Sequence, residues 1–454
     1  MAKIDLRVRG ASIVTPEGFM EGDLYVQDGK VIGLGLLDLP ASQTLEANGL
    51  LLFPGMVDAH VHFMDPADLS REDFPAGSAA AAAAGVTTVI EHTHGSPVHS
   101  PADLRQKADY LKNRSVVDFA LGAHFSMKHP REMVEVFREG AAFIKVFTCT
   151  THGIQGVPAG PLLQAMKLGG EEGLIFLVHA EDESLTATAE KELKASGRRD
   201  GGVIPEWRNS LAEEVAVATV GRLADRSKAA VVIAHCSHAP IVDLVAHYRQ
   251  RNAKIWAEGC PQYFFLKEDE IREKMGFRKF TPPARALSSR DQEEMWQRLR
   301  DGRISFLASD HAPATRAQKS EGSIWDVHFG LPGLDTTFPL MLDSASNGLL
   351  SYPRLADLYA RMPACIYGLY PRKGALLPGS DGDFTLVDPG IRYTIEDRNI
   401  LSKAGWTPYA GRTVQGKVVA TYLRGQKIAE AGRCLAPPGC GKFIRGKGWR
   451  ERPS

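Results

Sequence analysis

Cysteine is scarce in this sequence and follows no pattern. The chain of 454 residues contains six cysteines, and no two of them form a CxxC pair. So few scattered cysteines in a chain of this length do not make a disulfide framework, and they favour a reducing compartment. Asp5, Arg7 and Arg9 interrupt the first apolar residues. We therefore expect no signal peptide and predict a cytoplasmic protein.

The sequence also has no excess of positive or negative residues. Lys+Arg and Asp+Glu both number 54, which makes the formal net charge zero. This balance removes the electrostatic reason to expect nucleic acid or a membrane surface as a partner. No run of about 18 apolar residues occurs, so no transmembrane helix is predicted. A basic stretch, Lys442–Arg450, is expected to belong to a solvated tail of residues 435–454.

The middle of the chain alternates between two patterns. Segments of helical pattern, such as Ser78–Ala84, Pro130–Glu139, Leu211–Asp225 and Arg290–Asp301, separate apolar runs of strand length. The expected strands are Met56–His62, Thr87–His92, Asp118–His124, Ala142–Phe147, Leu174–His179, Ala230–His235, Lys254–Glu258 and Ile304–Ser309. Eight β/α alternations predict an α/β fold, a (β/α)8 barrel, which we expect to span residues 54–373.

Both ends of the chain have a different sequence pattern from the middle. Residues 4–53 read as short strands joined by glycine turns, and the same pattern returns near Gly382–Asp388 and Gly416–Gln426. Short strands at both ends around a different middle predict a small β-sandwich domain formed from both chain termini. We expect it to comprise residues 1–53 and 374–434.

Four of the predicted barrel strands end in residues that bind metals. The first carries His60 and His62, which point to the same side because residues i and i+2 of a strand do so. Three others end at His179, His235 and Asp310. A single HxH pair is weak evidence, but the strand ends of a barrel meet at one mouth, so these side chains converge. Imidazole and carboxylate donors suit Zn, Mn or Fe.

The fourth strand contains a lysine among apolar residues, in Phe143-Ile-Lys145-Val-Phe. A free ammonium ion is costly to bury. Its position alone leaves two interpretations open. Lys145 either pairs with a nearby carboxylate, or it takes up carbon dioxide and forms a carbamate that bridges two metal ions. Two ions about 3.5–4 Å apart need such a bridging anion.

A series of motifs runs through nearly the whole chain. It comprises Pro54-Gly-Met-Val-Asp-Ala-His60-Val-His62, Ala84-Gly-Val-Thr-Thr-Val, Phe143-Ile-Lys145-Val-Phe, Val178-His179-Ala-Glu181, Glu258-Gly-Cys-Pro-Gln-Tyr, Thr281-Pro-Pro-Ala-Arg285, Ser309-Asp310-His-Ala-Pro and Gly330-Leu-Pro-Gly-Leu-Asp335. In kind and order these motifs resemble the amidohydrolase superfamily, and within it the cyclic amidohydrolase branch of dihydroorotases, hydantoinases (dihydropyrimidinases) and allantoinases. The resemblance implies an enzyme that hydrolyses a C–N bond of a small cyclic amide or imide, and a homo-oligomer, either dimer or tetramer.

The resemblance also implies a metal centre with two divalent ions, zinc being the expected metal. His60, His62 and Asp310 would bind one ion, and His179 and His235 the other. Carboxylated Lys145 and a hydroxide would bridge the two. The metals lower the pKa of the bridging water and polarise the substrate carbonyl. Asp310 would take the hydroxide's proton and return it to the leaving nitrogen.

Five positions are implied in substrate binding, namely Met64, His94, Thr150, Pro283 and Gly333. Dihydroorotases carry an arginine in place of Met64, which binds the substrate carboxylate, and an asparagine in place of His94. Hydantoinases carry a tyrosine where this chain has Thr150. We therefore expect dihydroorotate to be a poor substrate, and a hydantoin, dihydropyrimidine or related imide to be the substrate.

Further histidines stay open to two interpretations. His94 and His152 either face the substrate or are packed or solvated side chains. The His92-Thr-His94 pair imitates the first HxH motif, but a third metal is not expected because the first pair already fits. Candidates for orienting the metal ligands are His238, His311 and His328.

Alternative functions also remain. The chain could be an allantoinase or a dihydroorotase. It could instead belong with the non-catalytic scaffold relatives that share this fold but have lost metal ligands. The six retained ligand-type side chains argue against a scaffold protein, and metal content would separate the two.

Overall fold

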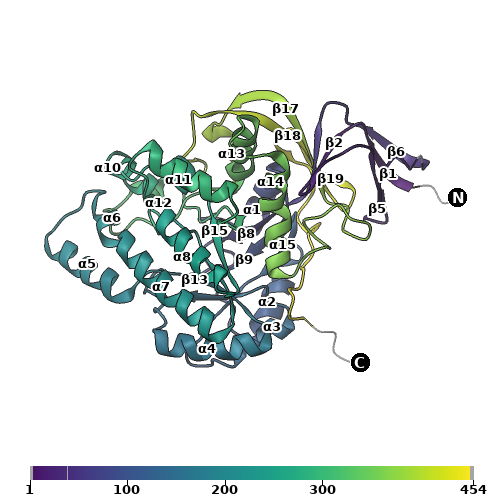
Figure 1. Cartoon of the computed structure of the whole chain (residues 1–454). Coiled ribbons are helices and arrows are strands. Elements are labelled where there is room, and N and C mark those ends of the chain that lie inside the picture. The colour runs from purple at the N-terminus through teal and green to yellow at the C-terminus, as the bar shows by residue number, and fades with distance from the viewer. Residues whose placement is uncertain (1–3, 38, 450–454) are drawn as a thin grey trace.

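The apolar segments of the middle region form the parallel strands of a closed barrel in the computed structural model, which describes residues 4–37 and 39–449 (Figure 1). The strands are β8 (Met56–Val61), β9 (Val86–Glu91), β10 (Asp118–Leu121), β11 (Ala123–His124), β12 (Ile144–Phe147), β13 (Ile175–His179), β14 (Ala230–Ile233), β15 (Ile255–Gly259) and β16 (Phe306–Leu307). The third predicted strand is split into β10 and β11. Gly122 separates them, and its N–H donates to Glu91 O.

The barrel closes between its first and last strands. The backbone N–H of His62 donates to the carbonyl of His311 at 2.8 Å, and the N–H of His311 donates to the carbonyl of His60 at 3.3 Å. Side chains alternate across the barrel wall. On β13, Ile175 and Leu177 face the interior cluster, so His179, two residues further on, lies on the same inner face. The predicted (β/α)8 barrel is thereby confirmed.

The helices comprise those that cover the outside of the barrel and short ones in its loops and in the C-terminal segment. They are α1 (Phe74–Ala83), α2 (Pro101–Leu111), α3 (Glu132–Glu139), α4 (Ala159–Glu172), α5 (Glu183–Ala195), α6 (Val203–Trp207), α7 (Ser210–Ser227), α8 (Ala239–Gln250), α9 (Gln262–Phe265), α10 (Glu270–Lys274), η1 (Met275–Arg278), α11 (Ser289–Arg300), α12 (Arg316–Ser320), α13 (Leu334–Ser346), α14 (Tyr352–Ala356), η2 (Asp357–Arg361), α15 (Met362–Tyr367) and η3 (Asp397–Asn399). In the part of the chain that the structure describes, no helix combines the length and apolarity that a membrane span requires.

Local capping decides where several helices begin. Helices α2 and α11 are capped by Ser100 and Ser288, each of which pairs with an aspartate three residues on in a capping box. Helix α1 begins at Phe74, four residues before the predicted start, because Asp73 caps it and Pro75 occupies its first turn.

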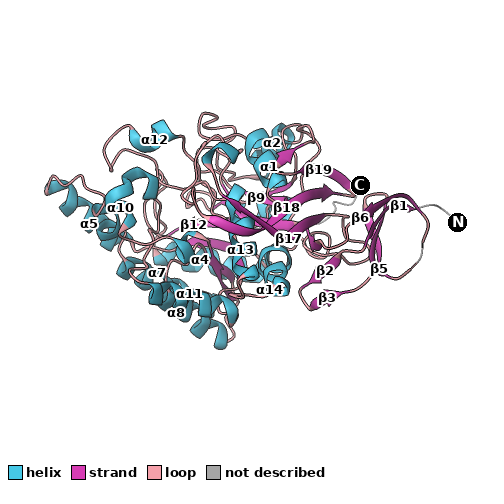
Figure 2. Ribbon diagram, turned by 90° about the horizontal axis from the view of Figure 1, so that it is seen from above, coloured by secondary structure: helices cyan, strands magenta, loops and turns pink. Residues whose placement is uncertain are grey.

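Strands from both chain ends form two sheets beside the barrel, which extend from the centre to the right of Figure 2. One contains β1 (Ile4–Arg9), β4 (Asp23–Gln27), β5 (Lys30–Gly35) and β6 (Ala41–Glu46); the other contains β2 (Ser12–Thr15), β3 (Gly18–Met20), β7 (Leu51–Pro54), β17 (Phe384–Thr394), β18 (Thr413–Leu423), β19 (Gln426–Glu430) and β20 (Arg433–Cys434). Antiparallel pairing of β7 with β17 joins the two ends. Leu6, Leu24, Phe384 and Tyr422 share one core, so the predicted terminal sandwich is confirmed.

The segment after β20 packs against the barrel. Ile444 is 2% exposed. Its N–H donates to Phe119 O, and the N–H of Phe119 donates to Lys442 O. The prediction of a solvated tail is therefore wrong for the segment around Lys442 and Ile444. Its backbone is hydrogen-bonded to Phe119 of β10. Residues 450–454 lie outside the described part of the chain.

Candidate active site at the mouth of the barrel

The carboxyl ends of the barrel strands surround one small cavity. The six side chains predicted as metal ligands all line it: His60, His62, Lys145, His179, His235 and Asp310. The cavity measures about 30 Å³, which is room for roughly one water molecule.

Backbone strain marks four of the lining residues. Met64, His152, His235 and Asp310 are not glycines, yet their φ angles are 58°, 52°, 37° and 49°. Such left-handed conformations are uncommon and cluster at functional sites. On β14, Val232 and Ala234 face the barrel interior, so strand alternation would turn His235 outward. Its left-handed backbone instead accompanies a side chain that lines the cavity.

The side chains of His60, His62 and Asp310 turn hydrogen-bond acceptor atoms toward one another. His60 Nδ1 lies 2.7 Å from Glu258 Oε1, and His62 Nδ1 lies 3.1 Å from the carbonyl of His92. These acceptors require protonated Nδ1 atoms, which leaves a lone pair on each Nε2. Both Nε2 atoms then face Asp310 Oδ1, at 3.2 and 3.5 Å. Burial lowers the pKa of His62 to about 4. Neutral imidazoles facing a carboxylate oxygen are the donor set of a divalent cation.

The second pair shows the same arrangement. His179 Nε2 lies 2.6 Å from Glu181 Oε2 and donates to it, so Nδ1 carries the lone pair. That Nδ1 lies 3.0 Å from His235 Nε2. Burial lowers the pKa of both imidazoles, although the Glu181 contact opposes this for His179. The lone pair of His179 Nδ1, beside the ring of His235, is a nitrogen donor of the kind that suits a second cation.

Lys145 lines the same cavity, and its Nζ lies 5.1 Å from the centre of the Phe147 ring. It is 2% exposed, and no hydrogen bond or ion pair of its Nζ exists among the described residues. Burial lowers its pKa to about 8, a shift that Glu258 and Asp310 oppose. The interpretation of Lys145 as one half of an ordinary ion pair therefore has no contact to support it.

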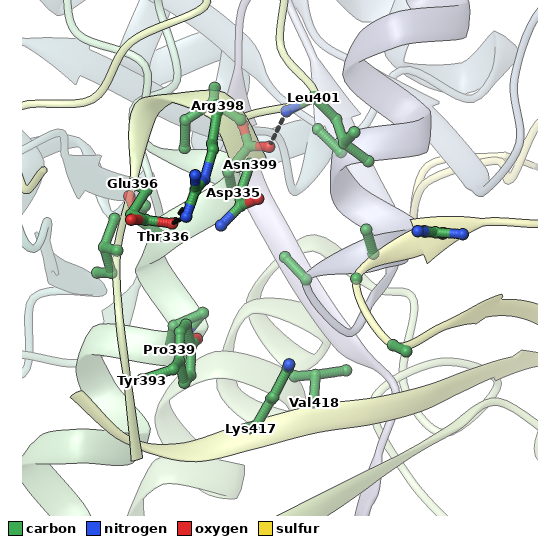
Figure 3. Close-up of a pocket in the computed structure, with 18 of the residues that line it drawn as sticks. Asp335, Thr336, Pro339, Tyr393, Glu396, Arg398, Asn399, Leu401, Lys417 and Val418 are labelled. Atoms are coloured by element: carbon green, nitrogen blue, oxygen red, sulfur yellow. Dashed lines mark hydrogen bonds and ion pairs between the residues drawn. The ribbon is translucent and has the colours of Figure 1, made fainter. Parts of the chain in front are cut away.

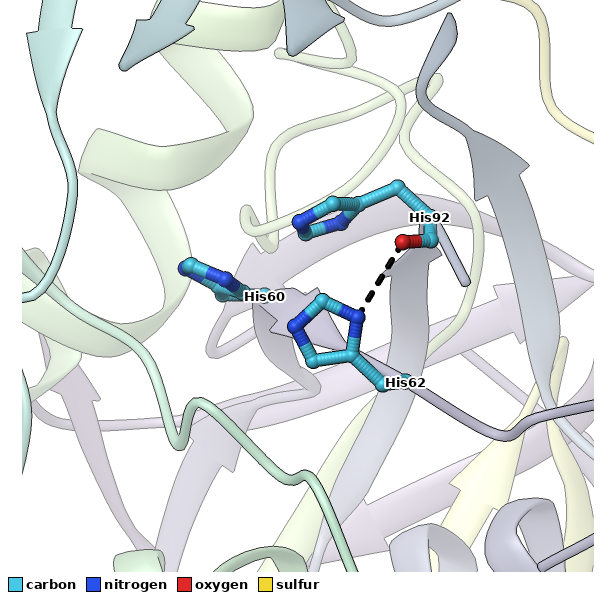
Figure 4. Close-up of side chains that lie close together, drawn as sticks. All are labelled: His60, His62 and His92. Carbon is cyan, nitrogen blue, oxygen red and sulfur yellow. Dashed lines mark hydrogen bonds between the residues drawn. The ribbon is translucent and has the colours of Figure 1, made fainter. Parts of the chain in front are cut away.

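His92 lies close to the first pair. Figure 4 shows its ring beside those of His60 and His62, and the ligand-type nitrogen atoms of the three lie within 4.8 Å of one another. Neither ring nitrogen of His92 has a hydrogen-bond partner among the described residues, and burial lowers its pKa well below the ordinary value. Its clearest contact is the backbone carbonyl that orients His62.

The groups that orient the ligands were not singled out from the sequence. Glu258, at the end of β15, accepts from the His60 ring and from the backbone N–H of His235. Glu181 contacts His179, Arg208 and Thr281; burial raises its pKa, but Arg208 and His179 more than offset this and lower it to about 2. A signal was present, because both carboxylates lie at or just after strand ends. Of the expected candidates, His311 instead accepts from the backbone of Gly333.

The five predicted substrate positions divide into two sets. Met64 and His94 line the cavity. His152 also lines it and stacks on His94 with ring centres 4.5 Å apart. Thr150, Pro283 and Gly333 do not line it: Thr150 is exposed and donates to Glu183. Arg71 and Phe329 also line the cavity.

A larger cavity lies elsewhere. It measures about 410 Å³ between helices α1 and α13 and strands β17 and β18. Figure 3 shows Tyr393, Arg398 and Lys417 among its lining. None of the six predicted ligands reaches it, so its greater volume does not make it the reaction site.

Comparisons with known proteins agree with this geometry. The amidohydrolase family matches residues 51–428. The chain is 30% identical to an L-hydantoinase of Paenarthrobacter aurescens over 97% of this chain and 98% of the relative. It is 31% identical to an allantoinase of Deinococcus radiodurans over 97% of this chain and 99% of the relative. The solved structure of an L-hydantoinase (dihydropyrimidinase) from Arthrobacter aurescens superposes with a TM-score of 0.93 at 29% identity, covering 97% of this chain and 100% of that chain.

Proposed function

The chain belongs to the amidohydrolase family, and from this membership we propose that it opens a cyclic amide or imide ring by hydrolysis, as hydantoinases and dihydropyrimidinases do. Water adds its hydroxyl group to the ring carbonyl carbon, the C–N bond breaks, and the nitrogen gains a proton. The product is a ring-opened carboxylate. One observation carries the proposal: lone pairs of His60 and His62 face the carboxylate of Asp310 at the barrel mouth.

Two divalent cations, zinc being the expected metal, would be held by the side chains described above. His60, His62 and Asp310 would hold one, and His179 and His235 the other. Bound there, they would supply an activated water near neutral pH and a polarised substrate carbonyl. Glu258 and Glu181 keep the imidazoles in the tautomers that leave donors facing the cavity.

Lys145 is proposed to bridge the two ions as a carbamate. A depressed pKa of about 8 leaves more neutral amine at neutral pH, and only the neutral amine attacks carbon dioxide. Asp310 is proposed as the proton carrier. Its carboxylate lies at the cavity and takes up the proton of the attacking water before returning it to the ring nitrogen.

The 31% identity to an allantoinase supports a second candidate, ring opening of a hydantoin that carries a ureido group. Dihydroorotate hydrolysis is disfavoured, because Met64 offers a thioether where an arginine would be needed. A cytoplasmic homo-oligomer, dimer or tetramer, remains part of the proposal.

Metal analysis and steady-state kinetics together test the proposal. We expect close to two divalent ions per chain, loss of hydrolysis on chelation, and recovery when metal is returned. The substrate panel is hydantoin, dihydrouracil, allantoin and dihydroorotate. Full activity with one ion per chain would contradict the bridged site, and metal-replete protein inactive on every ring would contradict the function.

A further inference from the structure

Arg71 lies in the loop between β8 and α1 and lines the ligand cavity. Its Nε–H donates to the carbonyl of Pro313 at 3.0 Å, which anchors one edge of the guanidinium. Neither Nη group has a hydrogen-bond or ion-pair partner among the described residues, and neither is sealed from solvent. The two Nη groups, on the opposite edge of the guanidinium, are therefore available to a ligand.

The charge of Arg71 is not neutralised by a direct partner. Asp68 is the acidic residue that acts on it, but the Asp68 carboxylate accepts from Ser70 N at 3.2 Å and from Ser70 Oγ at 2.6 Å. Burial lowers the pKa of Arg71 to about 10, a decrease that Asp68 opposes. Arg71 thus stays cationic at neutral pH.

The remaining cavity wall offers no comparable cation. Among the described residues that line it, Arg71 and Lys145 are the only arginine or lysine side chains, and Lys145 has a proposed role at the metals. His94 and His152 stack on each other, with ring centres 4.5 Å apart. Met64, on the same loop as Arg71, is a thioether that accepts from Thr93 Oγ1 at 3.5 Å.

We propose that Arg71 binds a carboxylate carried on a flexible arm of the substrate ring, as in a hydantoin with a 2-carboxyethyl group on its ring carbon. This inference rests on the proposed ring-opening function. A half-buried guanidinium without an anion is costly, and a carboxylate matches its two free donors in a bidentate pair. The arm is part of the proposal because Arg71 lies further along the loop than Met64, the position at which dihydroorotases bind a carboxylate attached directly to the ring.

The test compares two hydantoins of equal arm length, 5-(2-carboxyethyl)hydantoin and 5-propylhydantoin, with metal-replete protein. We expect kcat/KM to favour the carboxylate about 10- to 100-fold, the usual range for a charge-assisted pair. Arg71→Gln should remove this preference mainly through KM and leave the propyl compound within about threefold of wild type. Arg71→Lys should keep part of the preference, because it keeps the charge and loses the fork.

Arg316→Gln is the matched control. It removes the same charge from α12, where Arg316 is more than half exposed and pairs with Asp397, and it should leave both substrates unchanged. The inference is overturned if wild type opens the propyl compound as well as the carboxylate, or if Arg71→Gln lowers both equally. Failure to open either compound would count against the proposed function itself.

Discussion

Two buried clusters of ligand-type side chains lie at opposite ends of the barrel, and they differ in how their charges are balanced. At the strand starts, Asp118, Asp381 and Asp383 surround Lys373, whose Nζ lies 2.9 Å from Asp381 and 2.7 Å from Asp383 and also contacts Asp118. Arg424 pairs with Asp118 as well. Burial would lower the pKa of Lys373, but the three carboxylates raise it above the ordinary value.

The cluster at the barrel mouth is not balanced in this way by opposite charges of the protein. Burial lowers the pKa of His62, His179 and His235, the Nε2 atoms of His60 and His62 face Asp310, and the Nζ of Lys145 has no hydrogen bond or ion pair among the described residues. Both clusters gather three or more potential metal ligands. What separates them is whether the protein supplies the counter-charges: the first set of carboxylates already has its cations, whereas the second set of donors requires a cation from outside.

Removing the proposed bridge should have the largest effect. Lys145→Ala is expected to abolish hydrolysis, and acetate or propionate should restore part of it by occupying the carbamate position. Lys145→Arg should not restore activity, because a guanidinium stays charged and forms no carbamate. Kinetics and metal content would be measured together, and the mass of the active protein should include one added carbon dioxide. Active, metal-replete protein with an unmodified lysine would contradict the bridge.

Asp310→Asn should lower kcat by about 10²- to 10⁴-fold, the range typical of general acid–base catalysis. The amide still offers one oxygen to a metal but carries no proton between water and nitrogen. Metal content should fall much less than kcat. A variant with nearly wild-type kcat would assign the proton transfer to another group.

A substitution in the cluster around Lys373 should change the stability of the fold and not the hydrolysis reaction. Lys373→Met leaves three buried carboxylates without their central cation, and breaking a buried ion pair costs about 3–5 kcal/mol. The free energy of unfolding should fall by that amount while the folded protein still binds two metals. Lys194→Met is the control. It breaks an exposed pair with Glu190, which is worth at most about 1 kcal/mol. Equal losses in both variants would remove the distinction between the clusters.

The smallest effect is expected at Met64. Dihydroorotate carries its carboxylate directly on the ring, so it should be opened about tenfold to a hundredfold less efficiently than dihydrouracil. Met64→Arg should narrow that gap. The ratio of kcat/KM values for the two rings measures it, and an unmodified protein that prefers dihydroorotate would show that Met64 does not mark the carboxylate position.

Much of the fold could be predicted from local sequence pattern. Apolar runs and helical segments alternate eight times, and this period alone favours the barrel. Element ends were less accurate where a cap decides them, as at Asp73 before α1. The packed segment around Ile444 was missed because its basic residues resemble a solvated tail, and only contact with β10 shows otherwise.

The sequence by itself determined the types of side chain at the strand ends and the order in which they occur. From these, a metal-dependent hydrolase could be predicted. The tertiary structure alone decided which nitrogen of His60 faces the cavity, since Glu258 lies 198 residues away in sequence from the ring that it orients. It also decided that Arg71, and not Thr150, lines the cavity. Loop residues have no strand alternation to predict their direction, so their place depends on the packing of the whole barrel mouth.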